Sequence, residues 1–299
     1  LGNHDMGRAA CQLQERSRAS GDELLRRVLL AHDLLYLLRG APTVLYGDEV
    51  GIIGRGGDQQ ARQDLFPTQV AEWRTQPRVG APPVGTGSAF DVRSHPVAER
   101  LRQLAALRDA HPALSTGATV VRRAQGAVLA FSRVDAAARR EYLAAFNGGE
   151  TSARVTVPTS TPGASWTPLL GAAPAASAAN GSLSLTVPPL ATVLLRADTD
   201  LPRRAPARPT LRVEGDDLTD LWELTARVAG TAPVSVAFAV RRKTGGWRRL
   251  AVDDSPSYRG LLDPVRFRRN EKVHLVAVAR SLDGRTAVSK VVPFTVRRR

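Results

Sequence analysis

The sequence has few residues of the kinds that form disulfides or metal sites. Cys11 is the only cysteine among 299 residues, so an internal disulfide framework and a cysteine-rich metal site are excluded. We expect Cys11 to be a buried free thiol. Three of the five histidines, His95, His111 and His274, lack the spacing typical of metal ligands. The residues themselves therefore predict no metal and no cofactor.

Long hydrophobic runs are also absent. The most apolar stretch, residues 24–38, is too short for a membrane span and is interrupted by polar and charged side chains. These side chains are Arg26, Arg27, His32 and Asp33. No signal peptide is visible, and because the chain begins with Leu1 rather than Met, we expect that a preceding segment exists.

Lysine is nearly absent, although the formal net charge is +14. Residues 200–299 hold 21 lysines and arginines against 11 aspartates and glutamates, and the whole chain has three lysines. A charge of this size occurs in nucleic-acid-binding proteins, but no aromatic-interleaved basic motif and no zinc-ligand spacing accompanies it. Arginine-rich usage also follows from a GC-rich coding sequence. The sequence therefore disfavours nucleic acid as a partner and predicts no membrane interaction.

The first part of the sequence has an α/β pattern. Residues 20–39 predict a helix, because apolar residues recur with helical spacing and Ser20 and Glu23 are placed as a capping box. Residues 41–47, "APTVLYG", predict a short strand buried on both faces, as in a parallel sheet. A second amphipathic helix is predicted over residues 96–112.

The polar, glycine-rich stretch 51–94 is too long for an idle connection, which predicts a functional loop. Because no helix follows its glycines directly, it is not predicted to bind phosphate. Asp58 and Asp64 lie in this stretch, but the glutamines and Arg62 between them match a calcium-binding loop poorly.

From residue 116 onward, short apolar runs alternate with Gly, Pro and Asn, which is typical of antiparallel sandwiches. We assign residues 113–197 to one β-sandwich and residues 198–210 to a Pro- and Arg-rich linker. Residues 211–299 are assigned to an immunoglobulin- or fibronectin-like β-sandwich, with a hairpin turn at Asp283-Gly284.

Two helices and one strand are too few for a complete α/β domain, so we expect residues 1–112 to be a truncated part of one. "LGNHDMGR" (1–8) and "GAPTVLYGDEVGI" (40–52) resemble the ends of the seventh and eighth strands of the catalytic barrel of the alpha-amylase family of glycoside hydrolases. "GGDQQARQDLFP" (56–67) and "LRQLAALRDAHPAL" (101–114) resemble the stretch that follows there. The resemblance covers residues 1 to about 197 and leaves the last domain outside it.

The fold class that this resemblance implies is α/β plus all-β. It is the C-terminal part of a (β/α)8 TIM barrel over residues 1–112, followed by two β-sandwich domains. The implied activity is retaining hydrolysis of alpha-glucans such as starch and maltodextrins, which needs a nucleophile and an acid/base about 5 Å apart. In the family both come from the ends of the fourth and fifth barrel strands, which this sequence lacks. The chain alone is therefore expected to be inactive.

Asp5 matches the family's third carboxylate, which hydrogen-bonds the sugar at the scissile bond and stabilises the transition state. The substrate-binding residues implied with it are His4, Asn3 and Arg8. The motif residues implied to support the neighbouring loop are Tyr46, Gly47, Asp48 and Glu49. Adjacent side chains on a strand point in opposite directions, so the last two are not expected to flank one bond. The alternative, non-functional interpretation of the His-Asp pair is a local hydrogen bond at a strand end.

Other interpretations stay open. Within the family, the activity could be that of a trehalose synthase or a glucanotransferase. Outside catalysis, the chain could be a glucan-binding or structural protein. The family further implies an extracellular bacterial enzyme whose signal peptide is not in this chain, and it allows a calcium ion bound mostly by residues outside this chain.

Two further groups of residues invite a function. His32 and Asp33 resemble part of a metal phosphohydrolase site, but His32 falls on the apolar stripe of its helix, where we expect a buried histidine, and Asp33 falls on the polar side. Trp222, Trp247 and Tyr258 could form a sugar-stacking platform in the last domain, for which we favour a spacer or accessory role.

Overall fold

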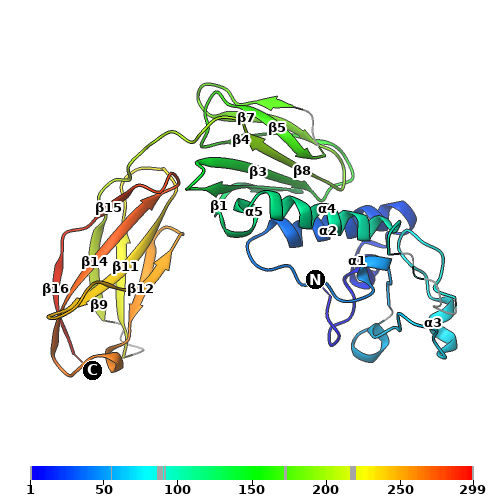
Figure 1. Ribbon diagram of the computed structural model, residues 1–299, viewed down its shortest axis with the longest axis horizontal. Coiled ribbons are helices and arrows are strands. Elements are labelled where there is room, and N and C mark those ends of the chain that lie inside the picture. Colours follow the sequence, from blue (N-terminus) through cyan, green and yellow to red (C-terminus); the bar gives the residue numbers. More distant parts are fainter. Residues whose placement is uncertain are drawn as a thin grey trace. The chain divides into compact units, whose positions relative to one another are not determined.

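The computed structural model describes residues 2–54, 56–85, 90, 92–171, 174–215 and 220–297. Leu1 of the first motif, and residues 55, 86–89 and 91 of the long loop, lie outside these ranges. The chain divides into two compact units, residues 1–135 with 140–200 and residues 136–139 with 201–299 (Figure 1). In the part of the chain that is described, no helix has the length and apolar character of a membrane span.

The first unit begins with helices. Helix α1 (Ala9–Ser17) was not predicted, whereas α2 (Gly21–Leu37) and α4 (Pro96–Ala110) confirm the two predicted helices. Ser20 is the N-cap residue of α2, but its side chain makes no capping hydrogen bond, so the predicted capping box is wrong. The short elements of this region are η1 (Asp48–Val50), η2 (Asp58–Ala61), α3 (Ala71–Thr75) and α5 (Ala113–Thr116).

Residues 41–47 do not form a strand, and this corrects the prediction. The segment is irregular, its side chains are mostly exposed or half-buried, and it ends in a turn at Tyr46 and Gly47. No described strand pairs with it, and an isolated strand would leave its backbone N–H and C=O groups without partners. The helical part therefore contains no parallel sheet, and the described residues contain no closed barrel.

The rest of the first unit is a β-sandwich. One sheet has six strands in the order β1 (Ala118–Gln125), β2 (Val128–Asp135), β3 (Arg140–Asn147), β8 (Ala191–Ala197), β5 (Ser165–Leu170) and β6 (Ala175–Ala176). The other sheet pairs β4 (Ala153–Pro158) with β7 (Ser182–Val187). All pairings are antiparallel, as the sequence pattern predicted.

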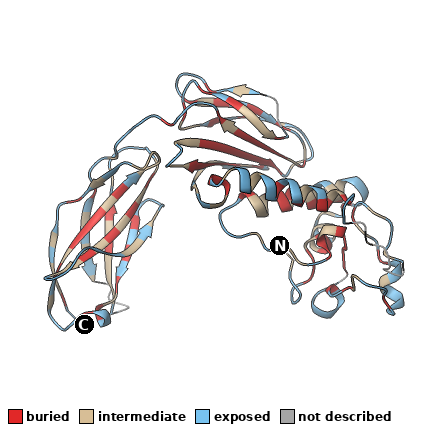
Figure 2. Cartoon of the chain, viewed as in Figure 1, coloured by how far each residue is buried: buried red, intermediate tan, exposed pale blue. Residues whose placement is uncertain are grey.

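The central strands of the six-stranded sheet, β2, β3 and β8, are buried on both faces (Figure 2). On β3, Leu143 and Ala145 enter the core between the two sheets. The alternate residues Tyr142, Ala144 and Phe146 pack against side chains from α2, α4 and α5. The helices therefore share a hydrophobic core with this sheet, which ties the helical segment to the β-sandwich.

The second unit is a separate β-sandwich. Its first sheet has the order β13 (Tyr258–Leu262), β10 (Trp222–Arg227) and β9 (Thr210–Gly215). Its second sheet contains β12 (Arg248–Asp253), β11 (Val234–Arg242), β14 (Glu271–Ser281), β15 (Thr286–Val288) and β16 (Val292–Val296). Side chains of both sheets, such as Leu224 and Phe238, share one core. The predicted hairpin is present, because β14 and β15 pair on either side of Asp283-Gly284.

Candidate functional site

The His4-Asp5 pair lies at the tip of a tight turn formed by residues 3–7. The Asn3 Oδ1 atom accepts hydrogen bonds from the backbone N–H groups of Asp5 and Met6, each at 2.8 Å. The Asn3 N–H donates to the Gly7 carbonyl at 3.3 Å and closes the turn. Because this side-chain oxygen is used inside the turn, the contribution of Asn3 to the site is to shape the backbone under the pair.

The side chains of the pair contact each other and are exposed. The His4 Nε2 and Asp5 Oδ1 atoms are 3.2 Å apart, and the two side chains are 62% and 68% exposed. Arg62 approaches the same Asp5 oxygen at 3.5 Å and donates its Nε–H to the His4 carbonyl at 3.3 Å. The Asp5 carboxylate is largely exposed, so it is accessible to an external donor.

Arg8 directly follows this turn and is fully buried. Its guanidinium donates to Asp48 Oδ1 and to the Tyr46 carbonyl, each at 2.8 Å, and to Gln63 Oε1 at 3.0 Å. Its side chain is 0% exposed, and that of Asp48 is 7% exposed. The Arg8 side chain is therefore surrounded by protein groups, and its part in binding substrate stays a prediction.

The motif residues Tyr46 to Glu49 surround this guanidinium. The Arg8 Cζ atom lies 5.4 Å from the centre of the Tyr46 ring, and the backbone of Gly47 lies beside the guanidinium. A Cβ atom on Gly47 would lie 3.1 Å from an Arg8 nitrogen, and φ at this residue is +88°, so only glycine fits well. Asp48 and Glu49 lie in η1 rather than on a strand, with Asp48 buried and Glu49 half-buried.

Burial dominates the electrostatics of Asp48. Removal from water raises the pKa of its carboxyl above the ordinary value, and the charge and hydrogen bond of Arg8 oppose that rise. A buried guanidinium beside a buried carboxylate is retained only when each compensates the other. The pair therefore joins residue 8 to residue 48 as one buried unit beneath the turn.

The long loop contributes two residues that the sequence did not single out for this role, Arg62 and Gln63. Gln63 is buried, accepts from Arg8, and donates to Gln76 Oε1 at 3.0 Å. The loop also touches the turn directly, because a Cβ atom on Gly7 would lie 2.6 Å from the Gly56 carbonyl oxygen. The only sequence signal was the length of the stretch 51–94, which predicted a functional loop without naming its residues.

Asp5 and Asp58 both contact Arg62, which lies between their carboxylates. A retaining hydrolase needs a nucleophile and an acid/base separated by about 5 Å of space for the sugar, and here an arginine occupies that space. The same cation makes the two aspartates a poor donor set for calcium. Among the described residues, no three His, Cys, Asp or Glu side chains gather as a metal site.

His32 and Asp33 have structural roles. His32 is buried, as predicted, and its Nδ1–H donates to the Val28 carbonyl at 2.8 Å. Asp33 is also buried, so the prediction of a polar, solvent-facing side chain is wrong. Its carboxylate lies 3.3 Å from Arg100, and burial raises its pKa against the opposing charge of that arginine. The contact between Asp33 and Arg100 connects α2 to α4, and among the described residues neither His32 nor Asp33 belongs to a group of metal ligands.

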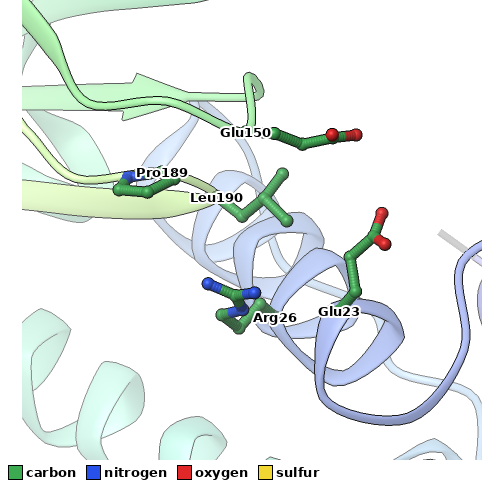
Figure 3. Close-up of a pocket in the computed structure, with 5 residues that line it drawn as sticks. All are labelled: Glu23, Arg26, Glu150, Pro189 and Leu190. Carbon is green, nitrogen blue, oxygen red and sulfur yellow. The ribbon is translucent and has the colours of Figure 1, made fainter.

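A shallow hollow of about 140 Å³ lies between the start of α2 and two turns of the β-sandwich (Figure 3). It is lined by Glu23, Arg26, Glu150, Pro189 and Leu190. None of the residues predicted to act in catalysis or binding lines it. The nearby Arg27 bridges Glu23 and Glu150 at 2.7 Å each, so ion pairs join the helix to the sandwich beside this hollow.

The three aromatic residues of the second unit that were considered as a sugar-stacking platform, Trp222, Trp247 and Tyr258, do not form one. Tyr258 is 5% exposed and belongs to the core. Trp222 packs edge-on against Phe294 with ring centroids 4.9 Å apart. Only Trp247 is exposed. A stacking surface made by all three side chains is therefore excluded.

Comparisons with known proteins identify relatives of both parts of the first unit. Residues 120–198 match the family model of the alpha-amylase C-terminal all-beta domain. Over 265 residues the chain is 38% identical to an alpha-amylase of Streptomyces lividans, a match that covers 87% of this chain. The chain spans 29% of the length of that protein.

Solved structures show the same fold. The alpha-amylase of Geobacillus thermoleovorans, complexed with acarbose, has a TM-score of 0.50 at 17% identity and covers 67% of this chain and 38% of that one. The structure of AmyP in complex with maltose has a TM-score of 0.51 at 22% identity and covers 68% and 41%. At these identities the two structures support the fold alone.

The match to the Streptomyces lividans protein is longer than the sequence motifs predicted. Because it covers 87% of the chain, it cannot be confined to residues 1–200 and must extend into the second unit. The expectation that the last domain lies outside the resemblance is therefore wrong. Taken together, these matches show that the chain is similar to part of an alpha-amylase and contains a domain similar to the alpha-amylase C-terminal all-beta domain.

Proposed function

We propose that this chain is part of a longer, extracellular glycoside hydrolase that cleaves alpha-glucosidic bonds in starch and maltodextrins, with Asp5 as its transition-state-stabilising carboxylate. The relative from Streptomyces lividans is an alpha-amylase, and fold neighbours bind maltose, maltotriose and acarbose. The observation that carries the proposal is an exposed carboxylate, 68% accessible, on a turn that is followed by the fully buried Arg8.

The chemistry of glycoside hydrolysis explains the need for such a carboxylate. Positive charge develops on the sugar ring as the bond breaks, and the ring distorts toward a half-chair. Hydrogen bonds from the sugar hydroxyls to Asp5 would strengthen as that charge forms, and so would lower the barrier rather than merely tighten binding. His4 holds one carboxylate oxygen, which leaves Oδ2 for the sugar.

Position matters as much as charge in this mechanism. A displacement of about 1 Å can cost about a hundredfold in rate when reacting groups must be aligned. The turn is fixed from three sides, by Asn3 within it, by the loop contact at Gly7, and by Arg8 below it. These contacts hold Asp5 in place before substrate binds.

The chain by itself is proposed to be inactive. Its exposed aspartates near the site, Asp5 and Asp58, share Arg62, so they are not proposed as the nucleophile and the acid/base. The nucleophile and the acid/base would come from other parts of the longer enzyme.

The test compares the full-length protein with the 299-residue chain on soluble starch, by assay of reducing ends and NMR of the first product anomer. We expect alpha-configured products from the full-length protein and no turnover by the chain. Turnover by the chain at the full-length rate would contradict the proposal. Trehalose, or redistribution of chain lengths without new reducing ends, would indicate the isomerase or transferase alternative. Starch binding without any turnover by the full-length protein would indicate a binding protein.

A further inference from the structure

One outer face of the second unit carries charge of a single sign. In the five-stranded sheet, alternate residues such as Phe238 and Val240 of β11 and Leu275 of β14 enter the core. The strand register places the intervening residues on the opposite, outer face. The charged residues on that face are Arg241, Arg249, Lys272 and Arg280, with His274 directly opposite Arg241.

No aspartate or glutamate of these described strands falls on this face. None of its four cations forms an ion pair with a carboxylate in the described part of the chain. The outer face of the three-stranded sheet differs, because there the arginines alternate with Glu214 and Glu223. On that face Arg259 approaches Glu223 at 3.3 Å. The two faces therefore differ in whether their positive charge is compensated.

Trp247 stands beside these cations, in the turn between β11 and β12. It is 41% exposed, and the Arg241 guanidinium lies 4.9 Å from its ring centre. The neighbouring outward residues of β11, Ala237 and Ala239, are small, and Val278 and Val276 of β14 lie opposite them. An aromatic residue thus does lie among basic residues in the stretch 241–249, contrary to the sequence analysis, which found no such motif.

We propose that this basic face, made of Arg241, Trp247, Arg249, Lys272, His274 and Arg280, binds an anionic polysaccharide. Arginine forks match carboxylate or sulfate groups in two-point contacts, and an exposed indole packs against the flat face of a sugar ring. A neutral glucan would leave the four cations without a role. The choice of a saccharide over another polyanion rests on the proposed function, which places the protein among glycans.

The experiment uses the 299-residue chain and polygalacturonate as the probe, with affinity measured by calorimetry at low and physiological salt. The double substitution Arg241→Gln with Arg249→Gln removes two cations from the basic face. We expect it to weaken binding about five- to tenfold, as the loss of two exposed ionic contacts implies. Trp247→Ala should weaken binding about threefold or more at both salt concentrations, because stacking is not screened.

The matched control removes the same charge from the other sheet, by Arg212→Gln with Arg227→Gln on its outer face. We expect the affinity of this control to stay within about twofold of that of the unmodified chain. Measurement at both salt concentrations separates any general effect of the lower net charge, which salt screens. Equal loss in both double variants would overturn the proposal, as would absence of binding to polygalacturonate. Tighter binding to single-stranded DNA or to soluble starch would also overturn it. Because no hydrolysis enters the assay, its outcome is independent of the role of Asp5.

Discussion

Replacement of the buried Arg8 by methionine tests whether its contacts stabilise the turn that carries Asp5. The substitution keeps much of the side-chain volume but removes the cation that contacts Asp48, the Tyr46 carbonyl and Gln63. Breaking a buried ion pair by loss of one partner costs about 3–5 kcal/mol, and each buried acceptor left without its donor adds to that cost. We therefore expect the free energy of unfolding to fall by at least about 3 kcal/mol at pH 7.

The loss should depend on pH in a defined direction. Burial raises the pKa of Asp48, and Arg8 opposes that rise, so removal of Arg8 should raise this pKa further. A carboxyl whose pKa is raised in the folded state stabilises the fold below its unfolded pKa, and this stabilisation is lost as the pH increases through the folded pKa. The deficit of the variant should accordingly be largest near pH 7 and shrink toward about pH 4.

The assay is urea unfolding across this pH range, with Arg27→Met as the matched control. Arg27 also holds two protein carboxylates, at 2.7 Å each, but its partners Glu23 and Glu150 are 37% and 72% exposed. Such surface pairs contribute about 0–1 kcal/mol, so this control should lose little stability. Equal losses for the two variants, or a deficit for Arg8→Met that grows on acidification, would refute the reasoning.

Two further predictions concern backbone and core. Gly7→Ala should lower the free energy of unfolding by at least about 2 kcal/mol, because φ is +86° and the new Cβ would lie 2.6 Å from the Gly56 carbonyl oxygen. The control Gly126→Ala has φ +60° and no atom within 4 Å of the new Cβ, so it should lose about half as much. Thermal unfolding measures both losses, and equal losses would contradict the prediction. Glu141→Gln should lower the free energy of unfolding by about 3–5 kcal/mol in the same assay, because the fully buried carboxylate forms an ion pair with Arg122 at 2.7 Å. A loss below about 1 kcal/mol would contradict a structural role for this ion pair.

The all-β parts were predictable because their signals are local. Turn residues separate the apolar runs, and strands such as β2, β3 and β4 begin and end within about two residues of those runs. The run 41–47 was misassigned because an apolar pattern reports burial but not whether a neighbouring strand exists to pair with it. The helix α1 was missed because it has only 9 residues and begins after Arg8, which is not a capping residue, so the sequence gives no clear helix start.

The candidate site was predictable only as a motif. The resemblance singled out His4 and Asp5 and placed them at a strand end, not in a turn. The burial of Arg8 could not be predicted, because its partner Asp48 is 40 residues away in the sequence. Arg62 reaches His4 across a separation of 58 residues. Contacts of this kind depend on how a long loop folds back, which periodicity and local propensity do not encode.

The measurement that tests the central claim most directly is the rate of starch hydrolysis by the full-length protein carrying Asp5→Asn, with Asp58→Asn as the control on the same arginine. The account predicts that Asp5→Asn lowers kcat by at least about a hundredfold. Its thermal stability should not change, because the side chain is 68% exposed. The kcat of Asp58→Asn should stay within about tenfold of that of the unmodified enzyme. A kcat for Asp5→Asn within about tenfold of the unmodified enzyme, or equal losses in both variants, would contradict it.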